Sequence, residues 1–135
     1  QVITSNVTKI KNTINIILQN MKLSMNDCFI MGFSQGGIMA FELGGSLTET
    51  LGGVAIISSR IIKREMDSNT FFQRTPIFIS HGGKDDILPI SNYYQSLEIL
   101  DKQNFHYESH LIEEDTHTIS PETIKLFQKF VKKNI

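Results

Sequence analysis

The first apolar pattern in the chain has the spacing of a helix. Apolar side chains recur every three or four positions, with lysines and asparagines between them, at Val7, Ile10, Ile14, Ile17, Leu18 and Met21. This spacing places the apolar side chains on one face, so it predicts an amphipathic helix over residues 4–21. Thr4, Ser5 or Asn6 is the expected N-cap.

Short apolar runs follow this helix and predict strands. Residues 28–31, 54–57 and 76–80 are mainly apolar, and glycine, serine or other polar positions lie beside each run. Runs of this kind are typical of strands that are buried on both faces of a sheet. Residues 105–112 instead alternate apolar and polar side chains, which predicts a strand at the edge of the sheet.

Three more helices are predicted among these strands. One covers residues 38–43 and is expected to stop at Gly44-Gly45. Another covers residues 90–103, and the last begins at Pro121 with Ser120 as its cap. The apolar faces of the two later helices are expected to hold Tyr94, Leu97 and Leu100 in the one and Ile124, Phe127, Phe130 and Val131 in the other.

Helices therefore alternate with strands along the whole chain. Parallel strands need crossover connections of this length, and the crossing helices pack on the faces of the sheet. The sequence predicts an α/β fold with a mainly parallel sheet and helices on both faces. Because no repeat, low-complexity stretch or linker interrupts the pattern, residues 1–135 are expected to form a single domain.

Composition and net charge argue against some classes of function. The 13 Lys and Arg residues against 14 Asp and Glu residues give a net charge of −1, which offers no electrostatic basis for binding nucleic acid. No apolar run approaches the roughly 18 residues of a membrane span. The lone Cys28 cannot form an internal disulfide and favours a reducing, cytoplasmic location. Because the chain begins at Gln1 rather than Met, we expect it to be incomplete at its N-terminus.

The strongest chemical signal is a G-x-S-x-G pattern between a predicted strand and a predicted helix, Gly32-Phe33-Ser34-Gln35-Gly36. In that context the serine lies on a sharp, strained turn that exposes its hydroxyl, and both glycines are expected to let strand and helix approach. The N–H of Gln35 would then point towards an oxyanion beside the serine. The alternative is a plain glycine-rich turn that binds phosphate at the start of the helix.

An acid and a histidine follow the serine in the order that a catalytic triad on this fold requires. Asp85 comes after the run at residues 76–80, with Asp86 as the alternative acid, and His117 comes between the last strand and the last helix. Because parallel strands end along one edge of a sheet, Ser34, Asp85 and His117 are expected to converge there. The sequence therefore favours a nucleophilic serine.

The remaining histidines are expected to have other roles. His81 is interpreted as a structural residue at the end of a strand, and His106 and His110 as surface or packing residues. His81, Asp85 and His117 lack the spacing of a metal site, so no metal is expected. The chemistry of a serine triad needs no cofactor either.

The chain resembles the carboxylesterase/phospholipase group of α/β-hydrolases, which includes the acyl-protein thioesterases. Gly32-Phe33-Ser34-Gln35-Gly36-Gly37 is similar to the family's nucleophile elbow, His81-Gly82-x-x-Asp85-x-x-x-Pro89 to its acid loop, and His117-x-x-Ser120-Pro121-Glu122 to its histidine loop. The resemblance spans the whole chain but only the later part of the family domain. It implies a three-layer α/β-hydrolase-like fold without the early strands, and a serine hydrolase that cleaves esters or thioesters of small acyl groups.

Two departures from the family pattern affect this interpretation. Glu114-Asp115-Thr116 stands where a glycine usually precedes the histidine, and no upstream His-Gly-x-Gly-type loop is found to supply the second oxyanion N–H. Without the early strands, residues 28–31 would form an apolar edge, so we expect them to pair with a missing N-terminal segment or with a second copy. The alternative functions are a catalytically impaired, hydrolase-like binding module and a peptidase of the same fold.

Overall fold

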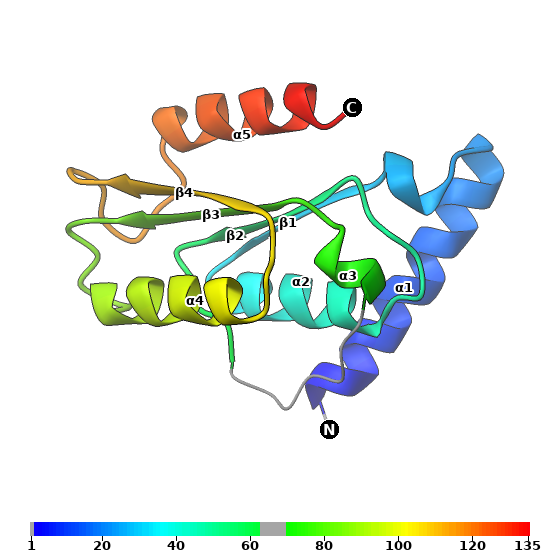
Figure 1. The fold of residues 1–135 in the computed structure, drawn as a ribbon, viewed down its shortest axis with the longest axis horizontal. Coiled ribbons are helices and arrows are strands. Elements are labelled where there is room, and N and C mark those ends of the chain that lie inside the picture. Colours follow the sequence, from blue (N-terminus) through cyan, green and yellow to red (C-terminus); the bar gives the residue numbers. More distant parts are fainter. Residues whose placement is uncertain (1, 63–69) are drawn as a thin grey trace.

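The computed structural model of the chain describes residues 2–62 and 70–135, in which four strands form one parallel sheet (Figure 1). The strands follow one another across the sheet in the order β1-β2-β3-β4. Their bounds are Phe29–Phe33 for β1, Gly53–Ile57 for β2, Ile77–Gly82 for β3 and Tyr107–Ile112 for β4. The predicted parallel α/β architecture is confirmed.

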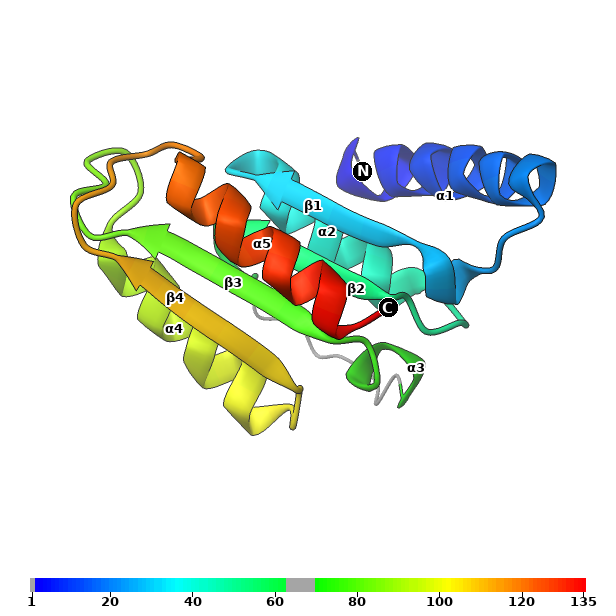
Figure 2. The same ribbon diagram turned by 90° about the horizontal axis from the view of Figure 1, so that it is seen from above.

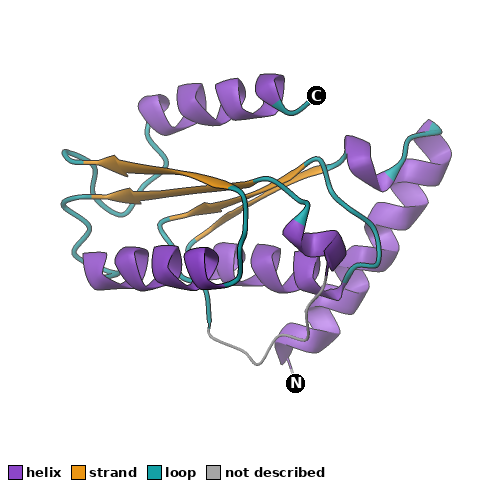
Figure 3. Cartoon of the chain, in the orientation of Figure 1, coloured by secondary structure: helices purple, strands orange, loops and turns teal. Residues whose placement is uncertain are grey.

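The helices pack on both faces of the sheet, which gives three layers (Figures 1 and 3). The helices in chain order are α1 Val2–Met21, α2 Gln35–Ser46, α3 Thr70–Gln73, α4 Ile90–Lys102 and α5 Pro121–Lys133, with a 3-10 turn at Met25–Asp27. Helices α2 and α4 cover one face, and α5 covers the other. Two apolar clusters result, one on each side of the sheet.

The central strands are buried along their whole length, whereas the outer strands are partly exposed. Every residue of β2 and β3 is buried, which agrees with the apolar runs seen there. Strand β4 lies at one edge, as its alternating pattern predicted, and β1 lies at the other edge of the sheet that the structure describes. The side chain of Met31 in β1 is 43% exposed, so this edge carries apolar surface.

Helices α1 and α2 extend beyond their predicted bounds, and α2 begins at Gln35 rather than at residue 38. Helix α1 begins at Val2, so Ser5 and Asn6 lie inside it and Thr4 is not its cap. Helix α2 continues through Gly44 and Gly45 to Ser46. A Cβ at Gly44 would overlap the ring of Phe72. The glycine therefore serves close packing between helices rather than helix termination.

The predicted apolar faces of α4 and α5 are confirmed in part, because Leu100 and Phe130 are buried and Leu97 and Phe127 pack against the core. In α4 the buried residues are Tyr93, Ser96 and Leu100, whereas Tyr94 is 53% exposed. In α5 the buried residues are Thr123 and Phe130, whereas Ile124 is 39% exposed. Residues three, four and seven positions apart share a helix face, so Tyr94 and Ile124 lie at the margins of the faces that hold Leu100 and Phe130. The predicted start of α5 is confirmed, because the Ser120 hydroxyl accepts the N–H of Thr123 at 3.2 Å.

Candidate active site

Ser34 lies in the turn between β1 and α2 in a strained backbone conformation. Its φ is 55° and its ψ is −122°, a region that non-glycine residues rarely occupy and that costs about 1–3 kcal/mol. A Cβ at Gly32 would overlap the carbonyl of Gly36, so glycine is required there. A Cβ at Gly36 would meet no atom of the described residues within 4 Å, so the expectation that both glycines avoid clashes is wrong for Gly36.

The carboxylate of Asp85 is held in the loop between β3 and α4. Its Oδ1 accepts the backbone N–H groups of Ile87 and Leu88 at 2.9 and 2.8 Å, and its side chain is inaccessible to solvent. Burial opposes ionisation of Asp85, but the hydrogen bonds from Leu88, His117 and Ile87 outweigh it and hold the pKa of Asp85 below its ordinary value. The carboxylate is therefore charged at neutral pH.

His117 lies between the other two groups. Its Nδ1 is 2.7 Å from Asp85 Oδ2, and its Nε2 is 3.1 Å from Ser34 Oγ. Because the Asp85 carboxylate only accepts hydrogen bonds, Nδ1 carries the proton and Nε2 is free to accept from the Ser34 hydroxyl. The structure thus brings Ser34, Asp85 and His117 together at the C-terminal edge of the sheet, while Asp86 is exposed.

Contacts between the acid loop and the histidine loop align Asp85 with His117. The N–H of Gly83 donates to the carbonyl of Ile112 at 2.9 Å, and the N–H of Lys84 donates to the carbonyl of Asp115 at 2.8 Å. The Lys84 ammonium also forms an ion pair with Glu114. Residues 114–116, which depart from the family pattern, therefore make their own connections to the acid loop.

His81 supports the acid loop from the buried end of β3. Its side chain is inaccessible to solvent, and its Nε2 donates to the carbonyl of Leu88 at 2.9 Å and lies 3.5 Å from Asp85 Oδ2. The ring also lies 5.8 Å, centre to centre, from that of Tyr93 in α4. His81 thus packs against the carboxylate that holds His117, a contact that its interpretation as a strand-end residue did not include.

Gln35 is the first residue of α2. The first N–H groups of a helix have no partner within the helix, so they are available to a negative charge that forms beside them. Since Gln35 directly follows Ser34, its N–H lies next to the hydroxyl that would attack a carbonyl. The arrangement can therefore pair a nucleophile with a hydrogen-bond donor for an oxyanion.

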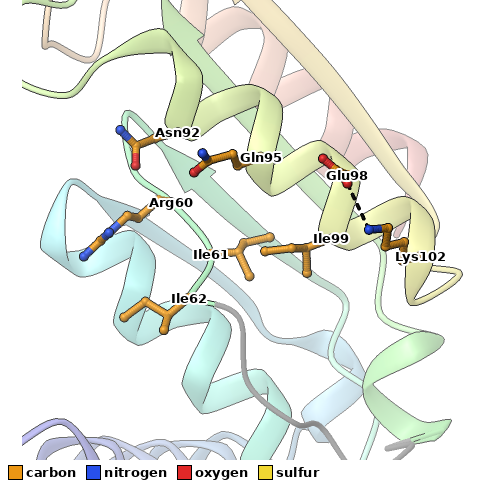
Figure 4. Close-up of a pocket in the computed structure, with 8 residues that line it drawn as sticks. All are labelled: Arg60, Ile61, Ile62, Asn92, Gln95, Glu98, Ile99 and Lys102. Atoms are coloured by element: carbon orange, nitrogen blue, oxygen red, sulfur yellow. Dashed lines mark ion pairs between the residues drawn. The ribbon is translucent and has the colours of Figure 1, made fainter.

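Three further features of the described residues concern metal sites, membrane spans and cavities. Within residues 2–62 and 70–135, no cluster of three His, Cys, Asp or Glu side chains is arranged to hold a metal ion, and no helix is long and apolar enough to cross a membrane. A cavity of about 340 Å³ lies between α4 and the segment after β2 (Figure 4). Its lining residues are Arg60, Ile61, Ile62, Asn92, Gln95, Glu98, Ile99 and Lys102. None of them belongs to the group of Ser34, Asp85 and His117.

Solved structures share this α/β-hydrolase-like fold. The crystal structure of Arabidopsis thaliana SOBER1 matches with a TM-score of 0.81 at 26% identity, over 96% of this chain and 65% of that protein. The crystal structure of esterase PE8 matches with a TM-score of 0.88 at 22% identity, over 98% of this chain and 62% of that protein.

The sequence identifies the family within this fold. Residues 1–135 match the phospholipase/carboxylesterase family, so the chain belongs to it. Acyl-protein thioesterase 1 of Emericella nidulans is 33% identical over an alignment of 115 positions that covers 77% of this chain. The chain spans about half the length of such curated relatives, 46% in this case.

Proposed function

We propose that this protein is a serine hydrolase that cleaves carboxylic esters or thioesters through an acyl-enzyme. The observation that carries the proposal is the unbroken hydrogen-bond chain from Ser34 Oγ through His117 to Asp85, at 3.1 and 2.7 Å. Acyl transfer on a parallel sheet of this family needs two features. They are a strained serine before a helix and a histidine that a buried carboxylate orients.

The proposed reaction has two halves. Ser34 Oγ attacks the carbonyl carbon while His117 Nε2 takes the hydroxyl proton, and the Gln35 N–H stabilises the oxyanion of the tetrahedral intermediate. His117 then gives this proton to the leaving alcohol or thiol, which leaves an ester on Ser34. Water attacks that ester with His117 as the base, and Ser34 leaves with the proton. Asp85 keeps the Nδ1 proton in place and stabilises the imidazolium.

The names of the relatives support a thioester or ester substrate. Acyl-protein thioesterase 1 of Emericella nidulans is among them, and acyl-protein thioesterase 1 of Saccharomyces cerevisiae is 29% identical over 92% of this chain. The same triad also attacks amides, so a peptidase is the competing enzyme. The second oxyanion donor would come from the part of the relatives that this chain does not span. The free thiol of Cys28 supports a cytoplasmic setting.

Detection of the acyl-enzyme tests the proposal directly. With a short-chain p-nitrophenyl ester, the protein should release a burst of one nitrophenol per active site, because an activated ester is expected to acylate Ser34 faster than water hydrolyses the acyl-enzyme. Rapid acid quench and peptide mass spectrometry should then find the acyl group on Ser34. A matched thioester should be hydrolysed and a matched amide should not. An acyl group on another residue, or cleavage of the amide as fast as the ester, would contradict this assignment. Absence of any turnover would favour the non-catalytic binding module.

We further propose that residues 1–135 are part of one larger domain, in which an additional β segment covers the β1 edge. Strand β1 ends the described sheet with an exposed Met31. Helix α1, at the same side of the sheet (Figure 2), exposes Ile10, Ile17 and Met21 by 38%, 49% and 61%. These three residues share one helix face. The matched part is 46% of the Emericella nidulans relative and 60% of the Saccharomyces cerevisiae relative, so both have the chain length to supply such a segment.

The chain of residues 1–135 on its own should therefore self-associate through β1. Sedimentation velocity should show an average mass that rises with concentration, because an uncovered edge strand pairs with another copy. Met31→Lys should weaken this association about tenfold or more, since pairing would bury an ammonium group. Ile135→Lys, which adds the same charge at the 91% exposed C-terminal residue outside β1, is the control and should have no effect. A folded monomer at all concentrations would contradict the proposal.

A further inference from the structure

The peptide group between Ser34 and Gln35 accepts a hydrogen bond from a serine that follows the neighbouring strand β2. The hydroxyl of Ser59, which follows β2 by two residues, donates a hydrogen bond to the carbonyl oxygen of Ser34. The N–H of Gly37 donates to the same oxygen at 3.0 Å. This carbonyl therefore has two donors, one from its own helix and one from a residue 25 positions away in the sequence.

The same peptide group carries the Gln35 N–H. A trans peptide is planar, and its C=O and N–H point in opposite directions. Hydrogen bonds that fix the carbonyl of Ser34 therefore also fix the direction of the Gln35 N–H, on the side away from Ser59. A carbonyl that accepts two hydrogen bonds also polarises the amide, which makes its N–H a stronger donor.

The local structure is shaped around this contact. Ser59 is 3% exposed, and the preceding Ser58 has a positive φ of 50°, which redirects the chain after β2. A Cβ at Gly37 would overlap the side chain of Ser59, so the glycine provides the space that Ser59 occupies. The N–H of Ser34 donates to the carbonyl of Ile57 at 2.9 Å. The turn at Ser34 is thus attached to the end of β2 through both its N–H and its carbonyl.

We propose that Ser59 is a positioning residue for the oxyanion hole, acting through the Ser34–Gln35 peptide. This inference rests on the proposed function, because it assigns a role in the reaction of Ser34. An oxyanion exists only in the transition state and the intermediate, so a misdirected N–H lowers kcat and leaves substrate binding unchanged. Ser59 is not a catalytic residue, because it contacts neither the substrate nor the reacting hydroxyl.

Replacement of Ser59 tests the inference. Ser59→Ala should lower kcat about tenfold with little change in KM, which is a fraction of the 10²- to 10³-fold loss typical when an oxyanion donor is removed. Its affinity for an alkyl boronic acid, which forms a tetrahedral anion on the serine, should fall by the same factor. Ser59→Cys, which keeps a weak donor of similar size, should fall between Ser59→Ala and the wild type. All rates are normalised to the active-site burst, and thermal unfolding verifies that each variant is folded.

Ser96→Ala is the matched control. Ser96 is also a buried serine whose hydroxyl donates to a backbone carbonyl, that of Asn92 at 2.8 Å. Its oxygen accepts the N–H of Ile61 at 2.9 Å, so Ser96 holds the same segment after β2 as Ser59 does but makes no hydrogen bond to the Ser34 carbonyl. Ser96→Ala should lose stability without losing kcat or boronate affinity. Suppose that turnover depends on Ser34 but kcat in Ser59→Ala equals that of the wild type or that of Ser96→Ala. This inference would then be wrong, while the proposed function would stand. Turnover that persists in Ser34→Ala would overturn the proposed function and this inference with it.

Discussion

Ser34→Ala should lower the rate of ester hydrolysis about 10⁶-fold, the loss typical of removing the nucleophile from a serine triad. The variant keeps His117 and Asp85 but has no oxygen to attack the substrate carbonyl. Covalent labelling by a fluorophosphonate should be lost completely. The measurements are initial rates with a p-nitrophenyl ester and the labelled fraction by intact mass.

The backbone of Ser34 provides a second, independent expectation. Because Ser34 has a φ of 55°, glycine should relieve the strain at this position, and Ser34→Gly should be inactive yet about 1 kcal/mol more stable than Ser34→Ala. Ser46→Ala, at the other end of α2, is the control and should keep its activity, since its hydroxyl donates only to the carbonyl of Leu43. If Ser34→Ala retained more than a tenth of the wild-type rate, the assignment of the nucleophile would be wrong.

Much of the site was predictable because its three loops obey local rules. A G-x-S-x-G pattern after a strand marks a sharp turn whatever the rest of the chain does, and parallel strands bring their C-terminal ends to one edge. Asp85 and His117 each follow a strand, so parallel strands bring them to the same edge of the sheet as Ser34. The apolar runs indicated parallel strands, because such runs are typical of strands that are buried on both faces, as β2 and β3 are.

The remaining features depend on tertiary contacts that no local pattern reveals. Ser59 lies 25 residues from Ser34, and the ion pair of Lys84 with Glu114 spans 30 residues. Gly44 appeared to be a helix stop because glycine is frequent there, but the ring of Phe72 determines its role. A sequence pattern indicates that a residue is small or polar, whereas the residues that contact it in the folded protein determine its structural role.

Asp85→Asn should lower kcat about 10⁴-fold while the protein stays folded, and Asp86→Asn should change kcat less than twofold. The asparagine oxygen can still accept the N–H groups of Ile87 and Leu88, which hold Asp85 Oδ1 in the wild type. Its NH₂ group would then face His117 Nδ1, as a donor where the carboxylate accepts. The imidazole would carry its proton on Nε2 and could not accept one from Ser34. Equal losses in the two variants, or a loss only in Asp86→Asn, would contradict the choice of Asp85 as the acid.

The pH dependence of unfolding separates this electrostatic role from simple packing. The hydrogen bonds to Asp85 outweigh its burial and hold its pKa below the ordinary value, so the folded protein binds the Asp85 proton less readily than the unfolded chain does. The stability that the carboxylate contributes is therefore present above its unfolded pKa of about 3.9 and is lost as the pH falls through the lower folded pKa. In Asp85→Asn, which cannot titrate, this part of the acid-induced loss should disappear. The midpoint of thermal unfolding could instead fall equally steeply with decreasing pH in Asp85→Asn and in the wild type. That result would show that the hydrogen bonds to the Asp85 carboxylate do not stabilise its charged form. In that case it could not stabilise a charged His117 during the reaction.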